Sequence, residues 1–235
     1  MNTMADALGA RLEAERRVTA DIAHELRTPV AAMMTATGLL PAGPAVDLVT
    51  GGVHKLRGLV EDVLEVARLD ADAVPVETET RQVSAMARRA VAGLDGAEGM
   101  VEVRIVTDAL AETDPRRVER MLTNLVANAL RHGAPPVTVE VDFERGRHGD
   151  GPVVRVRDHG PGVPPGLLTV LTTTGPQRFR TGGGSAGTGL GLTIAAGQAR
   201  LLSAPLTFRN HPDGGRGGAP APHRRRLRRH LRTAG

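Results

Sequence analysis

The spacing of the apolar residues changes once along this chain, and the change divides it into two kinds of fold. Up to about residue 69 the apolar side chains recur every three or four positions, which is the period of an amphipathic helix. Beyond residue 76, helical stretches alternate with segments in which every second residue is apolar, as in a half-buried strand. Residues 70–76 between them are rich in small and helix-breaking residues, so we expect a linker there. The expected elements are helices over 4–40 and 45–69 joined by a turn at 41–44, a helix over 83–94, a strand over 101–106, a helix over 115–132, strands over 137–143 and 153–157, a loop over 164–187, a helix over 190–202 and a short strand over 206–209.

A hairpin of two helices cannot cover its own apolar seam. We therefore expect two copies of the chain to pack as a four-helix bundle. A hairpin that packs against its own C-terminal domain is the alternative. In the second part, helices and mixed strands in this order predict a two-layer α/β sandwich, so the expected class is α+β.

The composition excludes several kinds of function. There is no cysteine, so disulfide frameworks and thiolate metal sites are excluded. There is no Trp or Tyr and only three Phe, so the stacking platforms that bind single-stranded nucleic acid are not expected. The net charge of +4 comes from the tail, because the last twenty residues hold seven Arg and no acid, and without those charges the balance is −3.

No apolar run approaches the roughly 18 residues that a membrane span needs, and no signal peptide is visible. We expect a cytoplasmic protein. The tail over 216–235 is basic and rich in Pro and Gly, and we expect it to be disordered.

His24 lies in the expected first helix, followed at once by Glu25 and one turn later by Thr28 and Pro29. A neutral imidazole is a fair nucleophile at pH 7, because its ordinary pKa is about 6.5. Glu25 could accept the N–H of the second ring nitrogen and so orient the ring. Thr28 presents its hydroxyl on the same helix face. Alone, such a histidine is more often a solvated helix residue, but these neighbours and the motifs downstream favour a reactive one.

Asn124 and Asn128 are one helical turn apart, so their amides share one face. A neutral amide oxygen suits Mg²⁺ that already carries the charge of a triphosphate. Arg131 could neutralise phosphate charge. The alternative is an ordinary polar helix face.

Asp158 ends an expected strand and leads into Gly160 and Gly162. A carboxylate there could accept a hydrogen bond from the exocyclic amine of adenine, which guanine lacks at that position. The glycines would let the backbone pass close to the ring. Without the other motifs, a strand-ending turn would explain this segment equally well.

Gly187, Gly189 and Gly191 open an expected helix, where backbone N–H groups can face anionic phosphate. The segment is neither a Walker A loop nor a dinucleotide-binding fingerprint, because no Gly-Lys-Ser/Thr follows and no strand precedes it. The stretch from Gly162 to Gly187 is long enough for a mobile lid.

In this order the four motifs resemble the H, N, G1 and G2 boxes of the catalytic core of bacterial sensor histidine kinases, over residues 1–215. The resemblance implies that His24 is the phosphoacceptor and that Thr28 helps to dephosphorylate the partner regulator. It also implies that Asn128 is the metal ligand, with Asn124 and His132 beside the nucleotide. The implied cofactors are ATP and Mg²⁺. The implied partners are a second copy of the chain and a response regulator, with any membrane link through a sensor region upstream. The implied domains are the end of a signal-relay linker over 1–20, a dimerisation and phosphoacceptor domain over 21–70, and an ATP-binding domain over 75–215, ahead of the basic tail.

The chain departs from that family in two segments of its second half. Between the glycine boxes only Phe179 remains of a phenylalanine-rich motif. After residues 214–218, an Ala-Pro-Ala-Pro stretch and an arginine run replace the usual apolar strand, and we expect that they cannot form a buried strand. The alternatives are therefore a degraded kinase acting as a regulator-binding dimer or phosphatase, and an ATPase that phosphorylates no histidine. A nucleic-acid binder rests on the arginine tail alone and is not expected.

Overall fold

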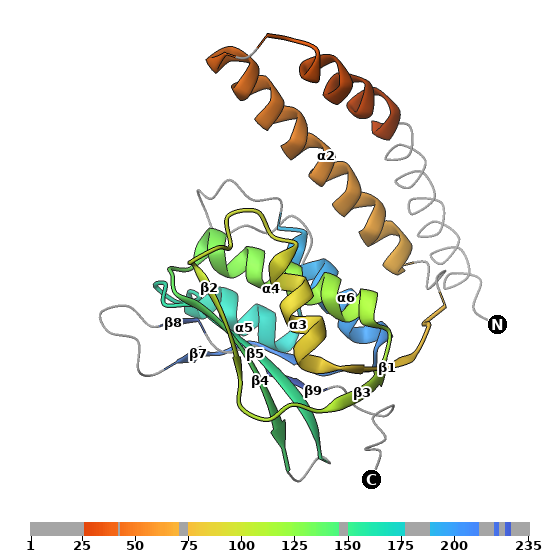
Figure 1. Cartoon of the computed structure of the whole chain (residues 1–235). Coiled ribbons are helices and arrows are strands. Elements are labelled where there is room, and N and C mark those ends of the chain that lie inside the picture. The colour runs from red at the N-terminus through yellow and green to blue at the C-terminus, as the bar shows by residue number, and fades with distance from the viewer. Residues whose placement is uncertain are drawn as a thin grey trace, which may run out of the picture. The chain divides into compact units, whose positions relative to one another are not determined.

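The computed structural model divides the chain into two compact units, Met1–Val74 and Pro75–Gly235 (Figure 1). The structure describes residues 26–41, 43–70, 75–145, 150–176 and 189–211, together with the backbone of 219–220 and 224–226.

The described part of the first unit is a helical hairpin. Residues 26–38 are helical, and α2 spans Pro44–Asp70, with proline at its first position where no backbone N–H is needed. Val30 of the first helix packs against Val53, Val60 and Leu64 of α2. This cluster confirms the expected seam.

The second unit contains the following elements: β1 Glu79–Gln82, α3 Val83–Ala92, β2 Val101–Ile105, β3 Leu110–Thr113, α4 Pro115–His132, β4 Val137–Glu144, β5 Gly151–Arg157, α5 Pro165–Thr173, α6 Gly191–Leu201, β6 Leu206–Thr207, β7 Asn210–His211, β8 Ala219–Pro220 and β9 Arg224–Arg226. Five of the strands form one sheet in the order β2-β4-β5-β9-β6. β2 runs parallel to β4, and the other neighbours are antiparallel. Two small sheets pair β1 with β3 and β7 with β8.

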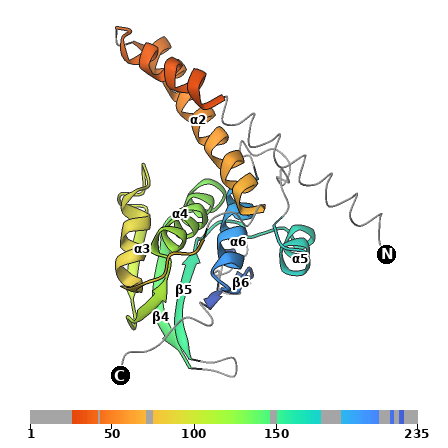
Figure 2. The same ribbon diagram turned by 90° about the vertical axis from the view of Figure 1, so that its right-hand side faces the viewer.

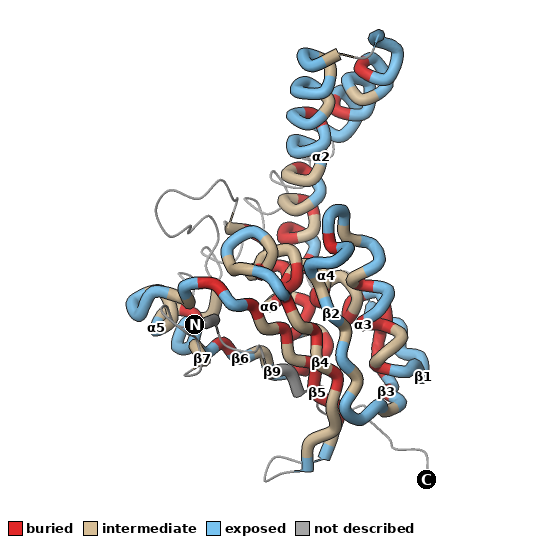
Figure 3. The backbone as a smooth tube through the Cα atoms, turned by 60° about the vertical axis from the view of Figure 1, so that its left-hand side comes forward, coloured by how far each residue is buried: buried red, intermediate tan, exposed pale blue. Residues whose placement is uncertain are grey.

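Helices α3, α4 and α6 cover one face of this sheet (Figure 2), which confirms the two-layer sandwich. The buried residues gather along β4, β5 and the helices facing them (Figure 3). The inner face of the β4–β5 hairpin pairs Val139 with Val156 and Val141 with Val154, and all four side chains are buried. Period-two alternation thus places one valine row in the core, as expected.

The opposite face of the same hairpin is charged. Arg155 pairs with Glu140 at 2.7 Å and Asp142 at 3.2 Å, and also with Glu144. Burial raises the pKa of Asp142, but hydrogen bonds from the Phe143 N–H and Arg155 outweigh it, so the net pKa is lowered. Partial burial alone would lower the pKa of Arg155. The hydrogen bonds to the three carboxylates stabilise its charged form and raise the pKa overall.

Several described segments differ from the expectations. Strands β1, β3, β7 and β8 were not expected. β1 in particular is exposed at every position and shows no apolar alternation. The expected loop over 164–187 contains α5, which begins at a proline and buries Leu171. Residues 177–188 of that loop lie outside the described residues.

A further difference lies in the basic tail, where disorder is expected but Arg224–Arg226 form β9 and pair with both β5 and β6. The structure describes only the backbone of this strand, so the expectation that the arginine run forms no buried strand stays a prediction. Ladder hydrogen bonds come from backbone N–H and C=O groups, which any residue except proline supplies, and this run contains no proline. Ala219–Pro220 of the tail form β8, which pairs with β7. The other residues of the tail lie outside the described residues, so their expected disorder stays a prediction.

Candidate functional site

The site is built on α4, whose ends are set by local sequence. Asp114 caps the helix by accepting hydrogen bonds from the N–H groups of Arg116 at 3.1 Å and Arg117 at 3.3 Å. Pro115 occupies the first position, and the helix ends at Gly133. One face is buried in the core, while Asn124 and Asn128 are half-buried on another.

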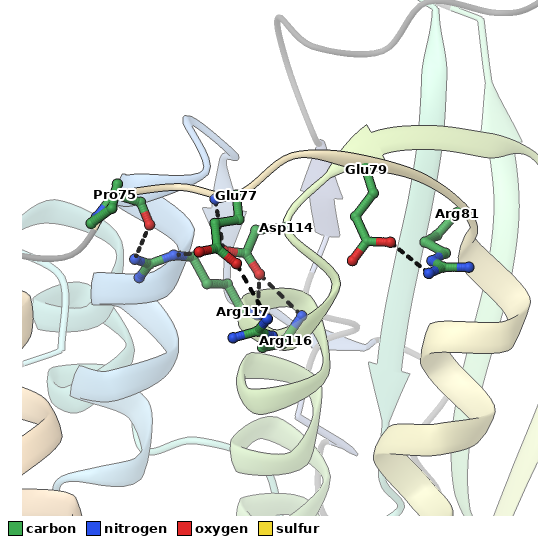
Figure 4. Close-up of polar contacts among 7 residues, drawn as sticks. All are labelled: Pro75, Glu77, Glu79, Arg81, Asp114, Arg116 and Arg117. Carbon is green, nitrogen blue, oxygen red and sulfur yellow. Dashed lines mark hydrogen bonds and ion pairs between the residues drawn. The ribbon is translucent and has the colours of Figure 1, made fainter.

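The start of α4 is fastened by a buried ion pair (Figure 4). Arg117 donates from Nε to Asp114 at 3.2 Å, from Nη1 to Gln198 of α6 at 3.0 Å, and from Nη2 to the Pro75 carbonyl at 3.3 Å. The Glu77 N–H donates to the same carboxylate at 3.2 Å. This network holds α4, α6 and the first residues of the unit together, and sequence reasoning did not identify it.

Asn124 lies against the third glycine of the last motif. Its Nδ2 donates to the Arg120 carbonyl at 2.8 Å, and its Oδ1 would lie 3.3 Å from a Cβ placed on Gly191. Gly189, just before α6, has a φ of +67°, which favours glycine. The structure therefore brings the asparagine motif to the glycine-rich N-terminus of α6.

Asp158 lies in a tight cradle of backbone. Its side chain is buried, and Oδ1 accepts the Gly160 N–H at 2.8 Å. A Cβ on Gly133 would lie 2.3 Å from Asp158 Cγ and 2.6 Å from the Ala129 carbonyl oxygen. A Cβ on Gly160 would lie 2.6 Å from Gly133 Cα. Neither position can carry a side chain unless the cradle opens.

Gly133 is a site residue that sequence reasoning missed. A glycine after a helix ending in Arg131 and His132 signals a C-cap. Its φ is −96°, however, so its need for glycine comes from the close approach of Asp158 and not from a left-handed turn. No pattern in the sequence reports a contact between residues this far apart.

Burial raises the pKa of Asp158, although hydrogen bonds to the Gly160 and Ala134 backbone and the charge of His159 oppose the shift. Gly162 follows with a φ of +82°, again a conformation that favours glycine. A buried carboxylate beside glycine backbone is suited to accept a hydrogen bond from an N–H group on a planar ring, because the glycines leave room for the ring.

Arg131 and His132 end α4 next to this cradle, and both are exposed. Partial burial of the ring lowers the pKa of His132, and the positive charge of Arg131 lowers it further. The ring is therefore mostly neutral at neutral pH. The positive charge at this end of α4 therefore comes mainly from the guanidinium of Arg131.

The remaining predicted residues are less fully described. His24, Glu25 and Gly187 lie outside the described residues, and Thr28 is exposed in the first unit. Among the described residues no group of three or more His, Cys, Asp or Glu side chains could hold a metal ion. The amide oxygen of Asn128 is of the uncharged kind that could hold Mg²⁺ when phosphate supplies the negative charge.

Two family models match this chain. The "His Kinase A (phospho-acceptor) domain" matches residues 14–72, and the "Histidine kinase-, DNA gyrase B-, and HSP90-like ATPase" matches residues 113–218. Within the part of the chain that the structure describes, no helix is long and apolar enough to span a membrane.

Two curated relatives match most of this chain. Sensor protein CseC of Streptomyces avermitilis is 53% identical over 225 residues, which is 94% of this chain and 43% of the relative. Sensor protein CseC of Streptomyces coelicolor is also 53% identical, over 94% of this chain and 41% of the relative. The chain thus spans about two fifths of the length of these relatives.

Solved structures show the same fold at lower identity. Full-length ShkA in complex with AMPPNP matches with a TM-score of 0.69 at 20% identity, over 89% of this chain and 45% of that chain. Histidine kinase AdeS of Acinetobacter baumannii matches with a TM-score of 0.58 at 19% identity, over 86% of this chain and 96% of that one. Both family models and relatives that are 53% identical agree, so the chain belongs to the sensor histidine kinases and carries their catalytic core.

Proposed function

We propose that this chain transfers the γ-phosphoryl group of ATP to His24 and then to an aspartate of a response regulator. The observation that carries the proposal is the cradle in which Gly133 and Gly160 enclose the buried carboxylate of Asp158. A degraded kinase would have little reason to keep contacts that exclude every side chain at two positions. The regulator-binding dimer without kinase activity is therefore not favoured.

The cradle selects the base. Asp158 accepts a hydrogen bond from the exocyclic amine of adenine, while the carbonyl of guanine would face a buried carboxylate with no proton between them. An unpaired acceptor of this kind costs about 1–3 kcal/mol, enough to discriminate between the two bases.

The phosphates lie toward the start of α6 and the end of α4. The glycine-rich backbone from Gly187 to Gly191 donates N–H groups, and Arg131 neutralises charge. Asn128 would hold Mg²⁺ through its amide oxygen, and the ion would add charge neutralisation at the transferred group.

His24 supplies the nucleophile. One ring nitrogen forms a bond to the γ-phosphorus as the bond to the bridging oxygen breaks, and ADP leaves with that oxygen. Glu25 accepts the N–H of the other ring nitrogen and steadies the imidazolium that forms. In the second transfer the carboxylate of the regulator takes the phosphoryl group, and Thr28 aligns water for its later hydrolysis.

We further propose that two copies join through the helical hairpin. Several of its apolar residues are exposed, with Leu39 at 82% and Leu48 at 79%. A second hairpin packed into a four-helix bundle would bury such residues. Sedimentation of the purified chain would give twice the monomer mass.

The test of the proposed function uses the full chain with γ-labelled ATP and Mg²⁺. Wild type should acquire an acid-labile label, and His24→Gln should acquire none while binding ADP with wild-type affinity. The matched variant His54→Gln removes a histidine of α2 and should label normally. Labelling of His24→Gln at the wild-type level would overturn the assignment.

A further inference from the structure

Strand β7 is two residues long, yet its side chains contact the residues directly before and directly after the loop 158–162, which carries Asp158. The Val163 N–H donates to Asn210 Oδ1 at 2.9 Å, and Asn210 Nδ2 donates to the Val163 carbonyl at 2.9 Å. His211 Nδ1 accepts a hydrogen bond from Arg157 Nη2 at 3.3 Å. Arg157 directly precedes Asp158, and Val163 directly follows Gly162, so β7 holds both ends of the loop 158–162.

The Asn210 contact imitates a rung of a β-ladder. A carboxamide presents one acceptor and one donor in a plane, as a peptide group does, and here it satisfies both backbone groups of one residue. No strand neighbour could do this, because Val163 lies beyond the end of β5 at Arg157.

The loop needs this support because it contains two glycines. Glycine loses more conformational freedom on ordering than any other residue, and Gly162 holds a φ of +82°. The carboxylate of Asp158 is fixed on one side by Gly160 and Gly133. The two bonds from Asn210 hold Val163, the first residue after the loop.

We propose that Asn210 is a positioning residue for the nucleotide, which with His211 brackets the loop 158–162 and keeps the Asp158 carboxylate aimed at the adenine amine. The proposal rests on the proposed function for the nucleotide itself. It assigns no contact between Asn210 and the ligand.

The test compares Asn210→Ala with wild type in the full chain, using ADP and GDP as probes. Loss of two hydrogen bonds from the loop should weaken ADP binding about three- to tenfold. GDP binding, which gains nothing from Asp158, should change less, so the ADP-to-GDP preference should fall. Amide hydrogen exchange at Gly160, Gly162 and Val163 should accelerate in the variant.

Asp108→Ala is the matched control. Asp108 also fastens a chain segment with two contacts, to the Ser84 N–H at 3.1 Å and to the Ser84 hydroxyl at 2.5 Å, at the start of α3. Its loss should lower the melting temperature by a similar amount and leave the nucleotide preference unchanged. An equal loss of preference in both variants would show that Asn210 acts only through stability and would overturn the proposal.

Asn210→Asp separates the two hydrogen bonds. It keeps the acceptor for the Val163 N–H and loses the donor to the Val163 carbonyl, so its ADP affinity and exchange rates should lie between those of wild type and Asn210→Ala. Wild-type ADP affinity, preference and exchange in Asn210→Ala would also overturn the proposal. If wild type binds no ADP, the proposed function is refuted instead. Amide hydrogen exchange at Gly160, Gly162 and Val163 would then be the only test of whether Asn210 supports the loop 158–162.

Discussion

The two sides of the main sheet differ in what specifies their strands. On the β4–β5 side, valines alternate into the core and Arg155 gathers three carboxylates on the outer face, so side chains and backbone specify the same strands. On the β9–β6 side, a run of arginines fills the gap between β5 and β6 through backbone pairing. The comparison teaches that an open strand edge can be filled by a segment whose side chains do not favour burial.

The largest expected effect on stability concerns the cradle around Asp158, which follows β5 on the β4–β5 side of the sheet. Gly133→Ala places a methyl carbon 2.3 Å from Asp158 Cγ, so the cradle must open. We expect a loss of about 2–3 kcal/mol in the free energy of unfolding, as for other overpacked sites, and loss of ADP binding. Urea unfolding and nucleotide titration measure the two effects.

Gly93→Ala is the control for that substitution. Gly93 also caps a helix with a negative φ, but a Cβ there would meet only the Arg89 carbonyl at 3.6 Å, which is ordinary contact. It should be close to neutral. Similar stabilities for the two variants would show that the cradle is loose.

Removal of residues 217–235 tests the β9–β6 side of the sheet. The truncation deletes β8 and β9 and so exposes the edges of β5 and β6. We expect a loss of several degrees in melting temperature, about 1–2 kcal/mol. A truncation after Arg226 keeps β9 and should melt like wild type. Equal melting of both truncations and wild type would favour the disordered tail that the sequence predicts.

Local signals explain how much could be predicted. The bounds of α4 follow from the Asp114-Pro115 cap and the glycine after His132, and the β4–β5 hairpin follows from alternation. Asp158 and Gly160 were identified because they are close together in sequence. Gly133 and Asn210 were not, since each matters through a contact with a segment more than twenty residues away.

The buried carboxylate of Asp158 also makes the free energy of unfolding depend on pH in a defined direction. Burial raises the pKa of Asp158 above its ordinary 3.8, so folding disfavours the ionised form. The stability of wild type should therefore fall as pH rises through the interval above 3.8, and Asp158→Asn should not show this fall. The stability of the variant relative to wild type should increase across that interval and then level off, while its ADP affinity is reduced at neutral pH.

Asp142→Asn provides the opposite case on the outer face of the same hairpin. The pKa of Asp142 is lowered, so its ionised form stabilises the fold above its ordinary pKa and this contribution is lost as pH falls. The deficit of Asp142→Asn should be largest near neutral pH and shrink in acid. Parallel pH profiles for the two variants would contradict at least one of the two assignments.

The smallest expected effect distinguishes most directly between the two sides of the sheet. The register places Arg225 between Val154 of β5, which is 4% exposed, and Leu206 of β6, which packs against the core. An apolar β-branched residue suits such a position better than an arginine, because cross-strand pairs between apolar residues add about 0.2–1 kcal/mol each. Arg225→Val should therefore raise the melting temperature by a few degrees. Arg228→Val makes the same substitution two residues after the end of β9 at Arg226 and should leave the melting temperature unchanged. If the two variants melt alike, Arg225 does not occupy a partly buried strand, in line with the expectation that the arginine run forms no buried strand.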